Sequence, residues 1–374
     1  MNKSNFFKIT LIYFISLLLF VGVRIVFGLG FLSGLSENWQ DIISTFIIQV
    51  VIMFAVPFLF YIIFQKQKPK ETFKNLGFKK IGSKALIYSI LIGLIAFVLN
   101  IAVSSIFNGI ITSFGYESSS SSTAFDGSFL SFVISIVCTA ILPAICEEFM
   151  HRGILMRGMF NSISVKHSLI ISSICFGLMH LNIVQVFYAS ILGLLIGFVS
   201  IVAKSIYPAM IIHFINNFMN VYLSYASYNK WPLGNFYDVI NDFLNTNFFF
   251  AMMVVILILC ALVYCLIRLI LSLLKVTNYE SYKNVINNVR KSFNKEQVNV
   301  NSISELGELH LLTDMEPILI EQMGEPKTNS EILFNDIYPK EKLYLKDKIF
   351  LICTIFLGCL ITIFTFIWGV LWLQ

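Results

Sequence analysis

Residues 146–152 read Cys146-Glu147-Glu148-Phe149-Met150-His151-Arg152 and end an apolar run that begins near residue 128. Each ionisable group inside a bilayer costs roughly 2.5–3.5 kcal/mol on insertion scales. His180 ends a second apolar run, and His213 lies inside a third. Three apolar runs thus each supply a side chain that can transfer protons, a pattern that favours a site built between membrane helices.

The composition fixes the fold class. Of the 374 residues, 57% are hydrophobic and 13% are charged, and the mean hydropathy is +0.81. Soluble domains carry about a quarter charged residues. Long continuous apolar runs indicate helices, because barrel strands alternate in polarity. The sequence therefore predicts an all-α polytopic membrane protein, a bundle of about eight to nine transmembrane helices with the site between helices.

Net charge and cysteine usage narrow the partners. The formal net charge of +5 is modest and does not suggest nucleic-acid binding. The seven cysteines all lie in apolar runs without the spacing of a metal site, so we interpret them as small core residues without a disulfide framework. The lipid bilayer is the expected surrounding of the chain.

Nine candidate spans follow from a length of about 20 residues for one membrane crossing. They cover approximately residues 7–30, 42–64, 85–107, 128–149, 168–181, 183–203, 206–226, 247–274 and 349–373. The fifth is short, so we expect either a half-buried helix or one that shares a turn with the sixth.

Basic residues indicate the orientation, because cytoplasmic loops are enriched in Lys and Arg. Seven lysines lie in the loop between residues 66 and 84, whereas the loops 31–41 and 108–127 have no basic residue. This asymmetry predicts a cytoplasmic N-terminus. Residues 276–348 are the largest polar segment and are net acidic; a partly ordered cytoplasmic loop is favoured over a folded regulatory module.

The first candidate cluster lies on one predicted helix. Glu148 and Arg152 are four residues apart, so they share a face and can pair. Glu147 is rotated about 100° from Glu148 and is left to act as a general base. Pro143 has no N–H, so it frees the carbonyl of residue 139. The alternative is that Glu147, Glu148 and Arg152 are only solvated at the membrane interface.

The other candidates lie on later spans. His213 and Asn217 are also four residues apart and could both donate to one point, as an oxyanion hole requires. The alternative is a polar contact between helices. His180 alone is more typical of a structural histidine, and His151 is interpreted as structural.

These motifs together, Glu147-Glu148-x-x-x-Arg152, Phe176-x-x-x-His180 and His213-x-x-x-Asn217, resemble those of the CAAX-protease and bacteriocin-processing (CPBP, Abi) family of intramembrane endopeptidases. The resemblance covers about residues 40–226, including a Leu76-Gly77-Phe78 turn that is similar to one in the bacterial members.

The resemblance implies a role for each motif residue. Glu147 and His180 would activate a water, and His213 and Asn217 would stabilise the oxyanion. Glu148 and Arg152 would order the helix end and help to bind substrate.

The resemblance also suggests a domain organisation. Residues 41–226 would form the intramembrane protease core, preceded by an extra helix in 1–40. The remaining parts are an additional helix region in 227–275, the polar segment 276–348 and a last helix in 349–374.

Whether the expected protease uses a metal ion is a separate question. Glu147, His180 and His213 form a legitimate zinc set, and zinc is the alternative cofactor. We favour metal-independent glutamate chemistry, because the chain has no HExxH pair.

Two other functional classes stay open as alternatives: a non-catalytic membrane immunity or scaffold protein of the same fold, and a proton-coupled transporter.

Frequent Ile, Asn, Lys and Phe suggest an AT-rich bacterial genome and hence a bacterial cell membrane. The expected substrate is a peptide or a membrane-anchored protein. The sequence makes no prediction of the oligomeric state.

Overall fold

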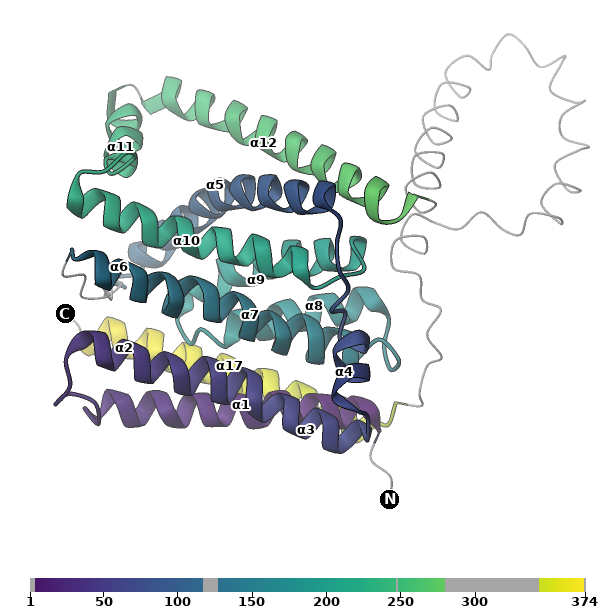
Figure 1. Ribbon diagram of the computed structural model, residues 1–374. Coiled ribbons are helices and arrows are strands. Elements are labelled where there is room, and N and C mark those ends of the chain that lie inside the picture. Colours follow the sequence, from purple (N-terminus) through teal and green to yellow (C-terminus); the bar gives the residue numbers. More distant parts are fainter. Residues whose placement is uncertain (1–3, 117–126, 247, 280–342, 373–374) are drawn as a thin grey trace, which may run out of the picture.

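The computed structural model describes residues 4–116, 127–246, 248–279 and 343–372, and all regular secondary structure there is helical. Seven of these helices are long and apolar enough to cross a membrane: Asn5–Gly28, Glu37–Gln65, Ser83–Ser113, Phe129–Arg157, Ile183–Val202, Phe249–Thr277 and Leu345–Ile367. Figure 1 shows the long helices side by side with their axes roughly aligned. The predicted all-α polytopic membrane fold is therefore confirmed.

The first half of the chain contains α1 (Asn5–Gly28), α2 (Glu37–Thr45), η1 (Phe46–Ala55), α3 (Val56–Gln65), α4 (Pro69–Asn75), α5 (Ser83–Ser113), α6 (Phe129–Ser135), η2 (Ile136–Ile141), α7 (Leu142–Glu148) and η3 (Phe149–Arg157). The second half contains α8 (Val165–Leu178), α9 (Ile183–Val202), α10 (Tyr207–Asn229), α11 (Phe236–Thr246), α12 (Phe248–Thr277) and α17 (Leu345–Trp372). The η segments are π-helical stretches, and all three described ones interrupt the second and fourth long helices.

The remaining two of the nine predicted spans are α8 and α10. The fifth span is indeed short, since α8 has 14 residues. The 23-residue α10 is long enough to cross, but its polar side chains, His213 among them, lower its hydropathy. The sequence analysis missed α11, an 11-residue helix between α10 and α12. Figure 1 shows α11 lying across one end of the bundle.

The lysine-rich loop marks one end of the helix bundle. Figure 1 shows the start of α1, the short helix α4 and the C-terminal end of α12 at one end of the bundle, whereas α17 ends at the other. The loop that contains α4 is the lysine-rich one. Most of the predicted polar segment 276–348 lies outside the described residues.

The outermost helices of the predicted domain plan pack onto the central ones. The Tyr13 hydroxyl of α1 donates to the carbonyl of Cys175 in α8 at 2.9 Å. The Thr365 hydroxyl of α17 donates to the carbonyl of Leu181 at 2.9 Å. The two outer helices also contact each other, because the Ser4 hydroxyl at the start of α1 donates to Asp347 of α17 at 2.6 Å. The helices outside the predicted core are therefore in direct contact with it.

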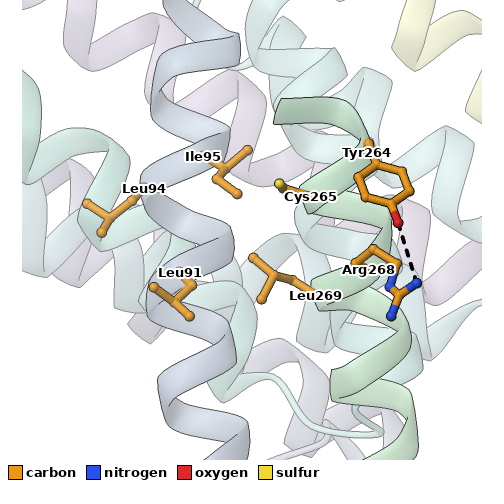
Figure 2. Close-up of a pocket in the computed structure, with 7 residues that line it drawn as sticks. All are labelled: Leu91, Leu94, Ile95, Tyr264, Cys265, Arg268 and Leu269. Carbon is orange, nitrogen blue, oxygen red and sulfur yellow. Dashed lines mark hydrogen bonds between the residues drawn. The ribbon is translucent and has the colours of Figure 1, made fainter. Parts of the chain in front are cut away.

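A groove runs between α5 and α12 at the periphery of the bundle (Figure 2). Its volume is about 560 Å³, and its lining is Leu91, Leu94, Ile95, Tyr264, Cys265, Arg268 and Leu269. Arg268 donates to the Tyr264 hydroxyl at 3.5 Å. None of these residues belongs to the three motifs, so the groove is not the candidate active site.

The pair formed by α8 and α9 depends on a close approach at Gly177. A Cβ added to Gly177 would lie 2.1 Å from the Ser190 hydroxyl oxygen and 2.5 Å from the carbonyl oxygen of Val186. Because the second contact is with backbone, we expect Gly177→Ala to lower the free energy of unfolding by about 1–3 kcal/mol, as overpacking does. Thermal unfolding in detergent measures the effect. Gly22→Ala on α1, which meets nothing within 4 Å, is the matched control; equal losses in both variants would contradict the prediction.

Candidate active site

The first motif forms a buried ion pair. Arg152 donates through Nη1 to Glu148 Oε1 at 3.0 Å, and both side chains are 0% exposed. Nη2 of Arg152 donates to the carbonyl of Gly193 in α9 at 2.9 Å, and the guanidinium lies 4.4 Å from the centre of the Phe176 ring. The pair therefore bridges three helices, and the alternative that Glu148 and Arg152 are solvated at the membrane interface is wrong.

The third motif joins this pair through His213. His213 Nδ1 lies 2.9 Å from the same Glu148 Oε1 that accepts from Arg152. An ionised carboxylate can only accept hydrogen bonds, so Nδ1 must carry the hydrogen. His213 is also buried. The Glu148 carboxylate thus holds together a guanidinium from its own helix and an imidazole from α10.

Glu147 faces a different environment from its neighbour. Its side chain is 15% exposed, and its Oε2 lies 3.9 Å from His213 Nε2. Its Oε1 accepts a hydrogen bond from Gln49 Nε2 at 2.7 Å. The rotation between successive helical residues predicts this separation. Of the two adjacent carboxylates, Glu147 is the one that stays accessible.

The Phe176 ring brings the three histidines of the region together. The ring centres of His151, His180 and His213 lie 5.2, 5.2 and 5.5 Å from that of Phe176, each in an edge-to-face arrangement. His180 Nδ1 bonds the carbonyl of Phe176 at 3.0 Å. Within the described residues, His180 has no hydrogen bond to Glu147. The second motif is therefore adjacent to the other two through an aromatic ring.

Asn217 donates a hydrogen bond to a backbone carbonyl near Pro143. Because Pro143 lacks an N–H, the carbonyl of Thr139 loses its helical donor, and the Asn217 amide donates to that carbonyl at 3.0 Å. The carbonyl of residue 139, which the sequence predicts to be free, is therefore the acceptor in this contact. An amide nitrogen has two hydrogens, so the contact with Thr139 uses one of the two N–H groups of Asn217.

His151 is a support for the motif helix. Its Nδ1 bonds the carbonyl of Glu147 at 2.9 Å, and the Ser172 hydroxyl donates to its carbonyl at 2.9 Å. Its ring lies between Phe176 and Tyr13, with the Tyr13 ring centre at 6.1 Å. These contacts agree with the structural role predicted for it.

The Leu76-Gly77-Phe78 turn packs against the motif-bearing helices. Leu76 is fully buried, and the Phe78 ring lies 6.1 Å from that of Phe149. The N–H of Ile206 donates to the carbonyl of Gly77 at 2.9 Å. Gly77 has φ +90°, and a Cβ there would lie 2.5 Å from Arg157 Nε. Only glycine suits this turn, which links the first motif to the start of α10.

Sequence reasoning missed Gln49, which touches the predicted base directly. A signal for it exists, since Gln49 is the one polar side chain in residues 46–60. Its distance of 98 positions from Glu147 explains why no local pattern joins the two. Gly193, whose carbonyl accepts from Arg152, was missed for the same reason.

The zinc alternative requires Glu147, His180 and His213 to converge on one point. No group of three or more His, Cys, Asp or Glu residues in the described ranges is arranged to hold a metal ion. His213 Nδ1 and Glu147 Oε1 are also engaged by Glu148 and Gln49. These residues do not fit the zinc set as they stand. Metal-independent chemistry stays a prediction, which a chelation experiment tests.

Comparison with known proteins identifies the segment that carries the motifs. Residues 129–219 match the family model for type II CAAX prenyl endopeptidases, described as Rce1-like. The matched segment contains every motif position from Glu147 to Asn217. The match confirms the family that the three motifs predict. No curated protein and no solved structure matches the chain.

Proposed function

Since residues 129–219 of this integral membrane protein match the family model for type II CAAX prenyl endopeptidases, we propose that it is a glutamate-dependent intramembrane endopeptidase. The main support for this proposal is the contrast between the two adjacent carboxylates. Glu148 is fully buried between Arg152 and His213, whereas Glu147 is 15% exposed and lies 3.9 Å from His213. One carboxylate orders the site, and the other reaches a reacting water.

The proposed reaction is hydrolysis of a peptide bond. Glu147, with His180 orienting the water, takes one proton from it while the water oxygen bonds to the carbonyl carbon. The carbonyl π electrons move to the oxygen, which becomes the oxyanion. Glu147 then gives the proton to the leaving amine nitrogen as the C–N bond breaks. The products are a free carboxyl and a free amine, and Glu147 returns to its ionised state.

Oxyanion stabilisation is assigned to His213 and Asn217. His213 Nδ1–H is held by Glu148, so a donor role requires a second hydrogen on Nε2 and hence a cationic ring. The carboxylates of Glu147 and Glu148 lie on the two sides of this ring, 3.9 Å from Nε2 and 2.9 Å from Nδ1. Asn217 supplies the N–H that Thr139 does not use. Preorganised donors of this kind stabilise developing charge in a dry site.

The substrate class is a peptide or a membrane-anchored protein, because the site lies within membrane helices. Orientation and location are part of the same proposal: the N-terminus is cytoplasmic, as the basic loop around α4 indicates, and the membrane is that of a bacterial cell. The proposal is tested with the purified protein in nanodiscs. Two kinds of substrate are offered: a farnesylated CAAX peptide and a library of unmodified quenched-fluorescence peptides. Failure to cleave any of them would favour the non-catalytic immunity or scaffold alternative.

Replacing Asn217 with Ala should lower kcat by about 10²–10³-fold, the loss that follows removal of one oxyanion donor. KM should change little, because the contact forms mainly in the transition state. Cleavage kinetics with the peptides above provide the measurement. Asn220→Ala is the matched control, because Asn220 lies one turn further on the same helix and bonds only the Asn216 carbonyl among the described residues. Equal rates for Asn217→Ala and wild type would remove Asn217 from the oxyanion site.

A further inference from the structure

Gln49 is a polar side chain in an otherwise apolar stretch. Residues 46–60 have no other polar side chain, and Gln49 is only 8% exposed. Burying an amide without a hydrogen-bond partner costs free energy, so a glutamine in the middle of a membrane helix needs a partner. The structure supplies that partner from another helix.

The partner is the proposed catalytic base. Gln49 Nε2 lies 2.7 Å from Glu147 Oε1, at the short end of the range for N–H···O bonds, where bonds to ionised groups are found. A carboxylate only accepts, so the NH₂ group and not the carbonyl oxygen of Gln49 must face Glu147. No other side chain among the described residues donates a hydrogen bond to the carboxylate of Glu147.

Local backbone geometry aims the two side chains at each other. Gln49 lies in the π-helical stretch Phe46–Ala55, and Glu147 lies in α7 between the π-helical stretches η2 and η3. Widened turns of this kind are rare and are frequent at functional sites. The helix with Gln49 packs directly against α7.

We propose that Gln49 is a positioning residue for Glu147, an inference that rests on the proposed function. Its amide holds Oε1 of the carboxylate, which leaves Oε2 directed toward His213 Nε2 and the reacting water. Gln49 Oε1 is buried and has no hydrogen-bond partner in the described parts of the chain. Because buried polar atoms are normally paired, we assign this oxygen to an N–H or O–H of the bound substrate or water.

The test compares Gln49→Met with Gln40→Met in nanodiscs. Methionine keeps the length and volume of the side chain but has no donor, and Gln40 is a control on α2 of the same long helix that bonds the carbonyl of Leu35. We expect Gln49→Met to lower kcat by about 10–10²-fold with KM unchanged, the scale of a misplaced reactive group. Gln40→Met should match the wild type.

Gln49→Glu adds a readout that a purely structural role would not move. A protonated glutamic acid has the shape of glutamine and can donate to Glu147, whereas an ionised one repels it. The activity of this variant relative to the wild type should therefore rise as the pH is lowered. A ratio that is flat with pH, or a Gln49→Met rate equal to that of wild type, would overturn the positioning role while leaving the proposed protease intact.

An infrared experiment separates this inference from the proposed function. With ¹³C-labelled glutamate, the carboxylate band of Glu147 is assigned by its loss in Glu147→Gln. We expect this band to shift in Gln49→Met and to stay in place in Gln40→Met. If the wild type cleaves no peptide but the band shifts, the endopeptidase proposal fails and the Gln49–Glu147 contact stands; an unshifted band shows that the contact is absent.

Discussion

Replacing Glu147 with Gln should reduce peptide cleavage by about 10²–10⁴-fold, the contribution of a positioned general base. Glutamine has the shape of glutamate, and its side-chain oxygen can still accept from Gln49, whose amide lies 2.7 Å from Glu147 Oε1. It cannot take a proton from water. Because Glu147 is not part of the buried Glu148–Arg152 pair, the melting temperature should stay close to that of wild type. Cleavage of the peptide probes and thermal unfolding in detergent measure the two quantities.

The control for this prediction is Glu37→Gln. Glu37 lies in the first turn of α2 and is exposed, so the same chemical change there should alter neither activity nor stability. Full activity of Glu147→Gln would remove Glu147 from its role as the base. Chelation of the active wild type separates the zinc alternative: activity that falls on chelation and returns with zinc would make His180 and His213 ligands instead of hydrogen-bonding groups.

Local sequence spacing predicted the parts of the site that lie on one helix. The pairing of Glu148 with Arg152 follows from a separation of four residues, and it forms at 3.0 Å. The carbonyl that Pro143 frees at residue 139 is also a local effect, although its partner, Asn217, could not be named in advance. Length and hydropathy located the long helices for the same reason, because both are properties of one segment.

Contacts between helices could not be predicted from the sequence. The bond from His213 to Glu148 joins residues 65 positions apart, and the bond from Gln49 to Glu147 joins residues 98 apart. In a membrane, apolar faces of helices and lipid tails are alike, so hydrophobic periodicity does not show which helix packs on which. The amphipathic α11 was missed because a search for long apolar runs passes over a short helix with Asp238 and Asp242 in it.

Replacing Arg152 with Met should lower the stability of the whole bundle. Arg152 is fully buried, where it balances the charge of Glu148 and donates to the carbonyl of Gly193. Removing one partner of a buried ion pair leaves the other charge uncompensated and costs about 3–5 kcal/mol. Urea unfolding in detergent, followed by tryptophan fluorescence, measures this loss. Arg24→Met, at an exposed position of α1, is the matched control and should change stability little.

A second substitution distinguishes loss of charge balance from loss of packing. In the double variant Arg152→Met with Glu148→Gln, the uncompensated carboxylate is gone, so part of the lost stability should return. Arg152→Lys should remain destabilised, because a single ammonium lacks the fork that reaches both Glu148 and the Gly193 carbonyl. If the double variant is no more stable than Arg152→Met, then packing of the guanidinium on Phe176, and not neutralisation of Glu148, is the main contribution of Arg152.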